Sequence, residues 1–205
     1  GIIAVKLDEG DTLVGVALTS GSDQVMLFSN AGKAVRFDEA NVRAMGRTAG
    51  GVRGMMLADG QQVISLLVAN SDEQQVLTAS DGGYGKRTRV GEFRQTSRGT
   101  QGVIAMDLTD KTGLGLVSAS LVEDSDDVML ITTGGVLIRT KVDQIRETGR
   151  SAQGVRLINL DDGEKLVCLV KVAESEESGD ADVDAEQAAD DGAAPAAEAG
   201  EGAAE

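Results

Sequence analysis

Short apolar runs separated by polar turns recur along the chain and predict β-strands. Mostly apolar six-residue runs lie at residues 13–18, 63–68 and 116–121. After a polar turn, a second apolar run follows each of them, at residues 25–28, 76–79 and 128–131. Runs of this length bounded by turn residues are typical of strands. A third strand-like run, such as residues 33–37, follows the next turn, so the pattern predicts an all-β protein.

Glycine turns separate the second and third runs of each group. Gly32, Gly83 and Gly135 each lie seven residues after the start of the second run. They follow Asn-Ala, Asp-Gly and Thr-Gly pairs, which are typical of tight hairpin turns. We therefore expect three β-hairpins, one around each of these glycines.

A seven-residue segment that opens on Gly-Val, or on Gly-Ile in its first copy, recurs with the same period. Its copies are GIIAVKL at 1–7, GVRGMML at 51–57, GVIAMDL at 102–108 and GVRLINL at 154–160. We call these the Gly-Val segments and expect each to supply a fourth strand. Four strands in about 50 residues match a propeller blade, whose neighbours stack to bury its faces. A β-sandwich of unrelated strands would not explain the common period.

The repeats end near residue 172, and an acidic segment follows. Residues 173–205 contain twelve acidic residues, no Lys or Arg, and mostly Ala and Gly otherwise. Such a composition cannot bury enough apolar surface to order itself. We predict a β-repeat domain over 1–172 and a disordered acidic tail over 173–205. Because the chain begins inside a repeat and holds three repeats plus part of a fourth, we expect it to be a fragment of a longer protein.

Charge and composition exclude several classes of function. The whole chain carries a net charge of −15, but 22 acidic residues remain against 19 basic ones once the twelve tail acids are set aside. The absence of His excludes a Ser-His-Asp triad, and the single Cys168 excludes an internal disulfide. We expect Cys168 to be a buried structural thiol, Tyr84 to be a turn or surface residue, and no metal or cofactor to be bound by this chain. No apolar run is long enough to span a membrane.

Basic residues recur in register with the strands. Three series of arginines share the repeat period and, with one lysine, form the candidate set: Arg36, Arg87 and Arg139; Arg43, Arg94 and Arg146; Arg47, Arg98 and Arg150; and Lys86. Equivalent positions on stacked blades would form basic bands around one surface. Such bands bind the nucleic-acid backbone without reading its sequence. We therefore expect these ten residues to contact the phosphates of a bent duplex.

These repeats resemble the C-terminal domain family of the DNA gyrase A subunit, the β-pinwheel. The resemblance covers residues 1–172. It rests on segments such as residues 9–16, 25–29, 42–46, 83–88 and 102–104. The acidic tail also matches the pattern of many members. The family's glycine- and basic-rich box belongs to its first blade and is absent here; the loops at 45–51, 96–102 and 148–154 carry degenerate versions. The resemblance therefore places the chain in the later blades.

The resemblance implies a non-catalytic module that wraps double-stranded DNA on a basic perimeter. In the family, blades exchange strands with their neighbours, and the wrapped segment is presented for ATP-dependent negative supercoiling. The catalytic tyrosine, ATP and Mg would then belong to other regions of the enzyme. The implied partners are gyrase B and the rest of gyrase A in a heterotetramer, in the bacterial cytoplasm at the nucleoid.

Two alternatives and one regulatory role remain open at this point. The alternatives are a propeller that binds proteins through its acidic turns and the C-terminal domain of the topoisomerase IV A subunit. The acidic tail is expected to compete with DNA for the arginines, because it carries many carboxylates on a flexible tether.

Overall fold

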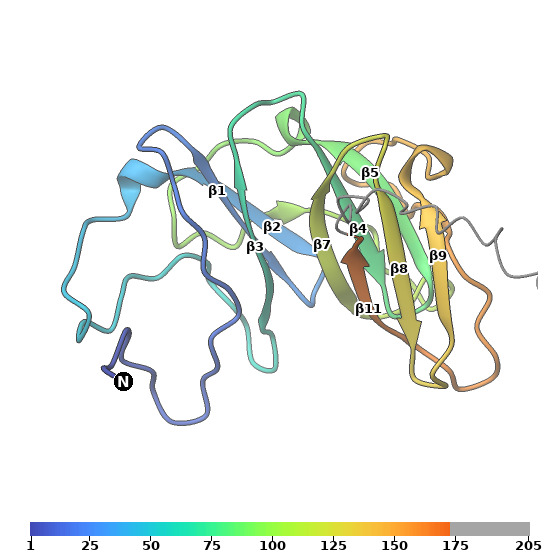
Figure 1. Ribbon diagram of the computed structural model, residues 1–205, viewed down its shortest axis with the longest axis horizontal. Helices are drawn as coiled ribbons and strands as arrows, with labels where there is room; N and C mark the ends of the chain where they lie inside the picture. The colour runs from blue at the N-terminus through green and yellow to red at the C-terminus, as the bar shows by residue number, and fades with distance from the viewer. Residues whose placement is uncertain (173–205) are drawn as a thin grey trace, which may run out of the picture. The chain divides into compact units, whose positions relative to one another are not determined.

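Three β-hairpins, one in each repeat, form the framework of the fold (Figure 1) in the computed structural model, which describes residues 1–172. They pair β1 (Gln24–Ser29) with β2 (Lys33–Asp38), β4 (Gln75–Ser80) with β5 (Tyr84–Arg89), and β8 (Asp127–Thr132) with β9 (Leu137–Lys141). Each hairpin leads into a short 3-10 helix, named η1 (Glu39–Asn41), η2 (Val90–Glu92) and η3 (Val142–Gln144). The predicted tail lies outside the described residues, so its boundary and its disorder remain predictions.

The three hairpin turns depend on glycine. Gly32, Gly83 and Gly135 have φ angles of 71°, 77° and 82°, a region that costs other L-residues free energy because of their Cβ atom. In the first turn, the Gly32 N–H donates to the Ser29 carbonyl at 3.0 Å. The hairpins predicted around these glycines are confirmed.

Each hairpin is completed by strands from the next repeat. On one side, β3 (Val63–Ala69) pairs with β1, β7 (Leu116–Val122) with β4, and β11 (Leu166–Lys171) with β8. On the other side, β6 (Val103–Ile104) pairs with β2, and β10 (Val155–Arg156) with β5. The results are sheet 1 (β3-β1-β2-β6), sheet 2 (β10-β5-β4-β7) and sheet 3 (β11-β8-β9). Sheets 1 and 2 thus have the four strands predicted for a blade, and strands are exchanged between neighbouring repeats.

Three predicted strands are absent, and the exchange explains why. Residues 13–18 have the composition of β3 and β7 but form no strand, and Leu18 is 96% exposed. The Gly-Val segments at 1–7 and 51–57 also form no strand, apart from one bridge between Met55 and Thr100. By analogy with β3, β6, β7 and β10, each of these segments would pair with a hairpin of an earlier repeat. The described chain has none there, and a strand needs a partner for its backbone N–H and C=O groups.

The apolar core lies between consecutive sheets. Between sheets 1 and 2, the rings of Phe28 on β1 and Phe93 after η2 pack edge to face, with centroids 5.8 Å apart at 77°. Between sheets 2 and 3, Leu77 and Leu130 pack with Val142 of η3. The 3-10 helices of the second and third repeats therefore place apolar side chains against the preceding sheet, which stacks the repeats as predicted.

The close approach of the Gly-Val segments to the hairpins generates a testable prediction. A Cβ on Gly102 would lie 2.3 Å from the Ala34 carbonyl oxygen, whereas a Cβ on the equivalent Gly51 would meet nothing within 4 Å. Both have positive φ, 76° and 80°. Gly51→Ala should therefore lower the free energy of unfolding by about 1 kcal/mol through backbone strain alone, and Gly102→Ala by about 2 kcal/mol more through overlap.

Chemical denaturation at sub-micromolar protein concentration measures both values. Equal losses for Gly102→Ala and Gly51→Ala would contradict the tight packing of the Gly-Val segment on β2.

Candidate nucleic-acid interface

The arginines of the first series connect neighbouring repeats. Arg36 of β2 is nearly buried, and its Nη1 donates to the carbonyls of Val90 and Phe93, at 3.0 and 3.2 Å, on either side of η2. Its Nη2 pairs with Asp72. Arg87 of β5 repeats this arrangement one repeat later, so both guanidinium groups bind the backbone around the next 3-10 helix.

Arg87 donates to the carbonyls of Ile145, at 2.5 Å, and Asp143, at 3.4 Å, which belong to the η3 region. It also pairs with Gln75 and Asp124. Arg139 holds the same position on β9, but its side chain is 63% exposed and binds Asp127 of its own hairpin. No 3-10 helix follows η3 within residues 1–172. The environment of this series thus depends on whether a further repeat covers it.

Lys86 is fully buried and also holds a neighbouring repeat. Its Nζ donates to Thr88 Oγ1 at 2.9 Å and to the carbonyls of Gly149 and Arg150 at 3.1 and 2.9 Å. Burial lowers the pKa of Lys86 to about 8, and the positive charge of Arg150 adds to this effect, while Glu92 opposes it. Arg36, Arg87 and Lys86 are therefore engaged inside the protein, and we do not retain them as phosphate contacts.

The series Arg47, Arg98 and Arg150 makes one repeated contact. Each guanidinium donates to the carbonyl of the third residue of the preceding Gly-Val segment: Arg47 to Ile3 at 3.4 Å, Arg98 to Arg53 at 3.2 Å, and Arg150 to Ile104 at 3.1 Å. Arg47 is exposed, and Arg98 and Arg150 are half-buried. Arg98 also donates to the Asn41 carbonyl at 3.0 Å. Since neutral carbonyls do not cancel the charge of a guanidinium, these arginines keep their positive charge at the surface.

The series Arg43, Arg94 and Arg146 is the most open to solvent. All three residues are exposed, and each follows the apolar residue that ends the 3-10 helix of its repeat. Within residues 1–172, none of the three forms an ion pair. Their spacing therefore repeats with the sheets, and their charges face solvent.

Of the loops that carry these arginines, those at 94–102 and 146–154 lie along the outer edges of the preceding hairpins, whereas the equivalent loop at 43–51 has no preceding hairpin within the described residues. Residues 94–102 follow β2: the Thr96 N–H donates to the Arg36 carbonyl at 2.8 Å, and Gln95 bridges Arg36 in parallel. Residues 146–154 follow β5 in the same way, with the Thr148 N–H on the Arg87 carbonyl at 2.9 Å. We call 43–51, 94–102 and 146–154 the outer-edge loops; together they present six arginines.

Two further arginines were not predicted from the sequence. Arg53 and Arg156 hold the third position of their Gly-Val segments, and both are exposed. Aligning the four segments by position would have found them. Arg156 of β10 also donates to the Tyr84 hydroxyl oxygen at 3.0 Å and lies over its ring, 5.5 Å from the centroid. Tyr84 is buried rather than a surface residue, and the bond from Arg156 lowers the pKa of its hydroxyl.

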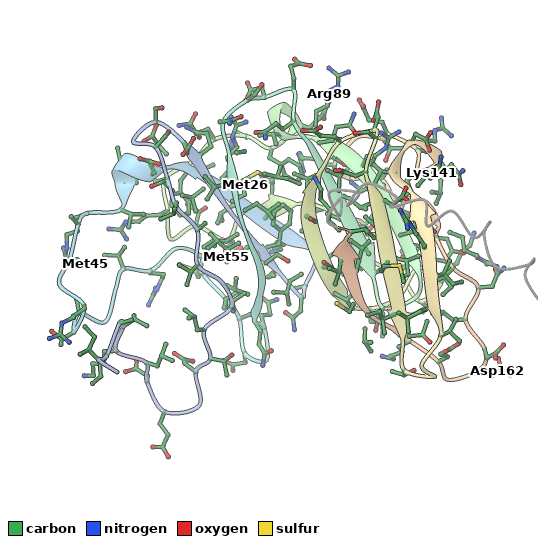
Figure 2. The ribbon with its side chains drawn as sticks, viewed as in Figure 1. Met26, Met45, Met55, Arg89, Lys141 and Asp162 are labelled. Carbon is green, nitrogen blue, oxygen red and sulfur yellow. The ribbon has the colours of Figure 1, made fainter. Side chains whose placement is uncertain are left out.

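Other basic groups at the periphery are neutralised locally. Arg89, which Figure 2 shows at the periphery, pairs with Glu73 and with Glu147, the latter at 2.9 Å. Hydrogen bonding to Glu147, supported by both carboxylate charges, raises the pKa of Arg89. Arg89 therefore offers less free positive charge than the arginines of the outer-edge loops.

Metal-binding clusters and membrane-spanning helices are both absent from residues 1–172. Within this part of the chain, no cluster of three or more His, Cys, Asp or Glu side chains could hold a metal ion. No helix in the same residues is long and apolar enough to cross a bilayer. Cys168 on β11 is half-buried, and so less enclosed than expected.

The repeats match a known domain family. The family model described as DNA gyrase C-terminal domain, beta-propeller, matches residues 1–20, 23–70, 74–114 and 126–171. The chain belongs to this family. The resemblance to the gyrase C-terminal domain and the propeller-like all-β fold are thereby confirmed.

Curated relatives support the same assignment. The DNA gyrase A subunit of Pseudomonas aeruginosa is 49% identical over 191 residues, which cover 93% of this chain and 20% of that protein. The DNA gyrase A subunit of Escherichia coli K12 is 50% identical over 182 residues, 89% of this chain and 21% of that protein. The chain thus spans about a fifth of the length of these gyrase proteins.

Solved structures resemble this gyrase-family fold to similar extents. The DNA gyrase A C-terminal domain has a TM-score of 0.75 and 28% identity, covering 84% of this chain and 58% of that one. The C-terminal domain of DNA topoisomerase IV has a TM-score of 0.77 and 27% identity, covering 82% and 52%. The fold is therefore common to both kinds of topoisomerase domain.

Replacing Arg87 and its equivalent Arg139 should separate their roles. Arg87→Met leaves the buried carbonyls around η3 without a donor and should lower the free energy of unfolding by about 3 kcal/mol. Arg139→Met removes one exposed ion pair and should cost less than about 1 kcal/mol. Denaturant titration of the two variants makes the comparison, and similar losses at both positions would argue against the inter-repeat role of Arg87.

Lys86 should give the protein a distinctive alkaline pH dependence. Between pH 8 and 10.5, unfolded Lys86 binds a proton that folded Lys86 largely lacks, so unfolding takes up protons and stability rises with pH. The stability of the wild type relative to Lys86→Met should therefore increase by about 2 to 3 kcal/mol across this window.

Denaturant titrations of the wild type and of Lys86→Met at several pH values measure this difference in the free energy of unfolding. The contributions of the other titrating groups are the same in both proteins and cancel in the difference. A difference that stays flat or falls with pH would show that Lys86 is not held in a desolvating environment.

Proposed function

We propose that this chain is a DNA-binding and DNA-wrapping module of a type II topoisomerase of the gyrase kind. The family assignment and the recurrence of Arg43, Arg94 and Arg146 on successive outer-edge loops support it. A guanidinium attracts phosphate oxygens, and charges repeated at the spacing of the sheets suit a duplex that follows the perimeter. The observation that carries the proposal is that this one series is exposed in all three repeats.

The proposed contacts form two groups. Arg43, Arg94 and Arg146 bind phosphates directly, because they have no ion pair within the described residues. Arg47, Arg98 and Arg150 use part of their donor capacity on protein carbonyls and direct the remaining N–H groups to the DNA. Binding through the backbone carries little sequence preference, and the three Phe and one Tyr are too few to provide a stacking surface.

In this proposal the chain takes no part in bond cleavage or ATP hydrolysis. The catalytic tyrosine, ATP and Mg belong to gyrase B and the rest of gyrase A, with which the module would act in negative supercoiling. The same surface would also serve a topoisomerase IV, whose C-terminal domain has a similar fold. The acidic residues 174–205 would compete with DNA for the arginines, because they carry twelve carboxylates and no basic group.

Binding to a linear duplex of about 100 bp across a salt series tests the proposal. Arg43→Gln/Arg94→Gln/Arg146→Gln should weaken binding and reduce the salt slope, the change of log K with log salt concentration, by about 2 to 3. The matched control is Lys111→Gln/Lys165→Gln/Lys171→Gln. It removes the same charge from exposed positions outside the outer-edge loops, and it should change the slope by less than about 1.

Equal effects of the two triple variants would contradict a defined arginine surface. In the same assay, removing residues 174–205 should raise DNA affinity, and an unchanged affinity would rule out competition by the tail. If the folded wild type does not bind DNA at low salt, the alternative of a protein-binding propeller would be favoured.

A further inference from the structure

Two side chains on one face of β5 bind three consecutive carbonyls of the third outer-edge loop. The Lys86 Nζ donates to the carbonyls of Gly149 and Arg150, at 3.1 and 2.9 Å. The hydroxyl of Thr88 accepts from the Lys86 Nζ at 2.9 Å and donates to the Thr148 carbonyl at 3.0 Å. Every N–H of the ammonium thus has an acceptor, and the backbone of the loop is fixed to sheet 2.

The bound carbonyls belong to the turn that carries Arg150. The Ala152 N–H donates to the Gly149 carbonyl at 3.1 Å and closes this turn. From the turn, the Arg150 guanidinium reaches the Ile104 carbonyl at 3.1 Å. Because Lys86 binds the carbonyls of both Gly149 and Arg150, the orientation of the turn depends on Lys86, and so does the direction of the guanidinium.

The equivalent positions in sheet 1 are apolar. Val35 of β2 takes the place of Lys86, Phe37 takes that of Thr88, and both are buried. Val35 has no N–H group to offer to a loop carbonyl. A valine therefore suffices for packing at this position of a sheet, whereas a buried amine costs free energy unless it is hydrogen-bonded. What Lys86 adds to the packing is its set of bonds to the loop.

Few charged groups surround the Lys86 amine, and the strands β1, β3, β4 and β7 contain none. The charged or titratable side chains around it are Glu92 of η2, Arg150 of the loop, Tyr84 on the same face of β5, and Arg36 of β2, which reaches η2 and is paired with Asp72. Burial, together with the charge of Arg150, lowers the pKa of Lys86 to about 8. The amine is therefore mostly neutral at mildly alkaline pH.

The neutral amine can hold the loop as the ammonium does. It keeps two N–H groups for the carbonyls of Gly149 and Arg150, and its lone pair can accept from the Thr88 hydroxyl. The loop in turn encloses the amine. When the loop opens, Lys86 meets water and its pKa returns toward the ordinary value of 10.5. Above pH 8 the opening therefore takes up a proton, so it becomes less favourable as pH rises.

We propose that Lys86 is a positioning residue for DNA binding, which holds the turn at Gly149 and Arg150 so that the Arg150 guanidinium is directed to a phosphate. Lys86 is fully buried and does not contact DNA itself. The equivalent Arg98 is independent of Lys86, because its loop lies on sheet 1, where Val35 takes the place of the lysine. The inference rests on the proposed DNA binding, but its first test needs no DNA.

Amide hydrogen exchange of the full 205-residue chain provides this first test. In the wild type, the protection factor of the third outer-edge loop divided by that of the second should rise about threefold to tenfold between pH 7 and 9. In Lys86→Met this ratio should be about tenfold lower at pH 7 and independent of pH, because the two carbonyls lack a donor. The second loop is the internal control, since a loss of global stability lowers both protection factors.

A wild-type ratio that stays flat or falls with pH would overturn the proposal, even if Lys86→Met does not fold. Tyr84→Phe is the control for the other titrating group on this face of β5, and it should keep the wild-type pH dependence. A pH dependence that disappears in Tyr84→Phe would assign the effect to Tyr84 and contradict the role of Lys86.

DNA binding by paired variants provides the second test. On a linear duplex of about 100 bp, Lys86→Met should weaken binding about threefold, the effect of one misplaced phosphate contact. Lys86→Met should have no further effect in an Arg150→Gln background and its full effect in the matched Arg98→Gln background. Equal effects of Lys86→Met in the two backgrounds would overturn positioning through Arg150.

The same titrations distinguish failure of the role of Lys86 from failure of the proposed function. If the folded wild type does not bind the duplex, the proposed function fails and the role of Lys86 fails with it. If the wild type binds and Lys86→Met binds equally well, only the role of Lys86 is overturned.

Discussion

The structure depends on the pairing of each hairpin with strands from the next repeat. A hairpin leaves two rows of backbone N–H and C=O groups at its edges, and each row needs partners. Here β3 and β6 serve the first hairpin, while β7 and β10 serve the second. Because a sheet is complete only when its successor is present, the repeats are linked by hydrogen bonds as well as by apolar contact. Folding of one repeat therefore stabilises the repeat before it.

The same dependence explains why identical positions behave differently along the chain. Arg36 and Arg87 are covered by the next repeat and bind its backbone, whereas Arg139 is not covered by a further 3-10 helix within residues 1–172 and pairs with Asp127 in solvent. An arginine of this series thus links two repeats when the next repeat covers it, and it is a surface charge when no repeat covers it. A repeated sequence position defines where a side chain lies on its sheet, but the neighbouring repeat decides its solvation and its role.

The same dependence on neighbouring repeats limits what could be predicted from the sequence alone. The hairpins around Gly32, Gly83 and Gly135 were predictable, because a short turn and its flanking strands depend only on local residues. Residues 13–18 have the same composition as true strands, yet they lack an edge to pair with. The burial of Lys86 and Arg87 was equally hidden, because the carbonyls that bind them belong to residues more than 50 positions later.

Local rather than net charge governs the proposed interface. The described residues carry a small net negative charge, so the protein as a whole does not attract a polyanion. At physiological ionic strength, however, charges interact mainly within about 8 Å. A phosphate at an outer-edge loop then responds to the arginines of that loop, while carboxylates such as Asp127 and Glu73 are already paired. The arrangement of ion pairs, which leaves Arg43, Arg94 and Arg146 free within residues 1–172, thus gives this nearly neutral part of the chain a basic edge.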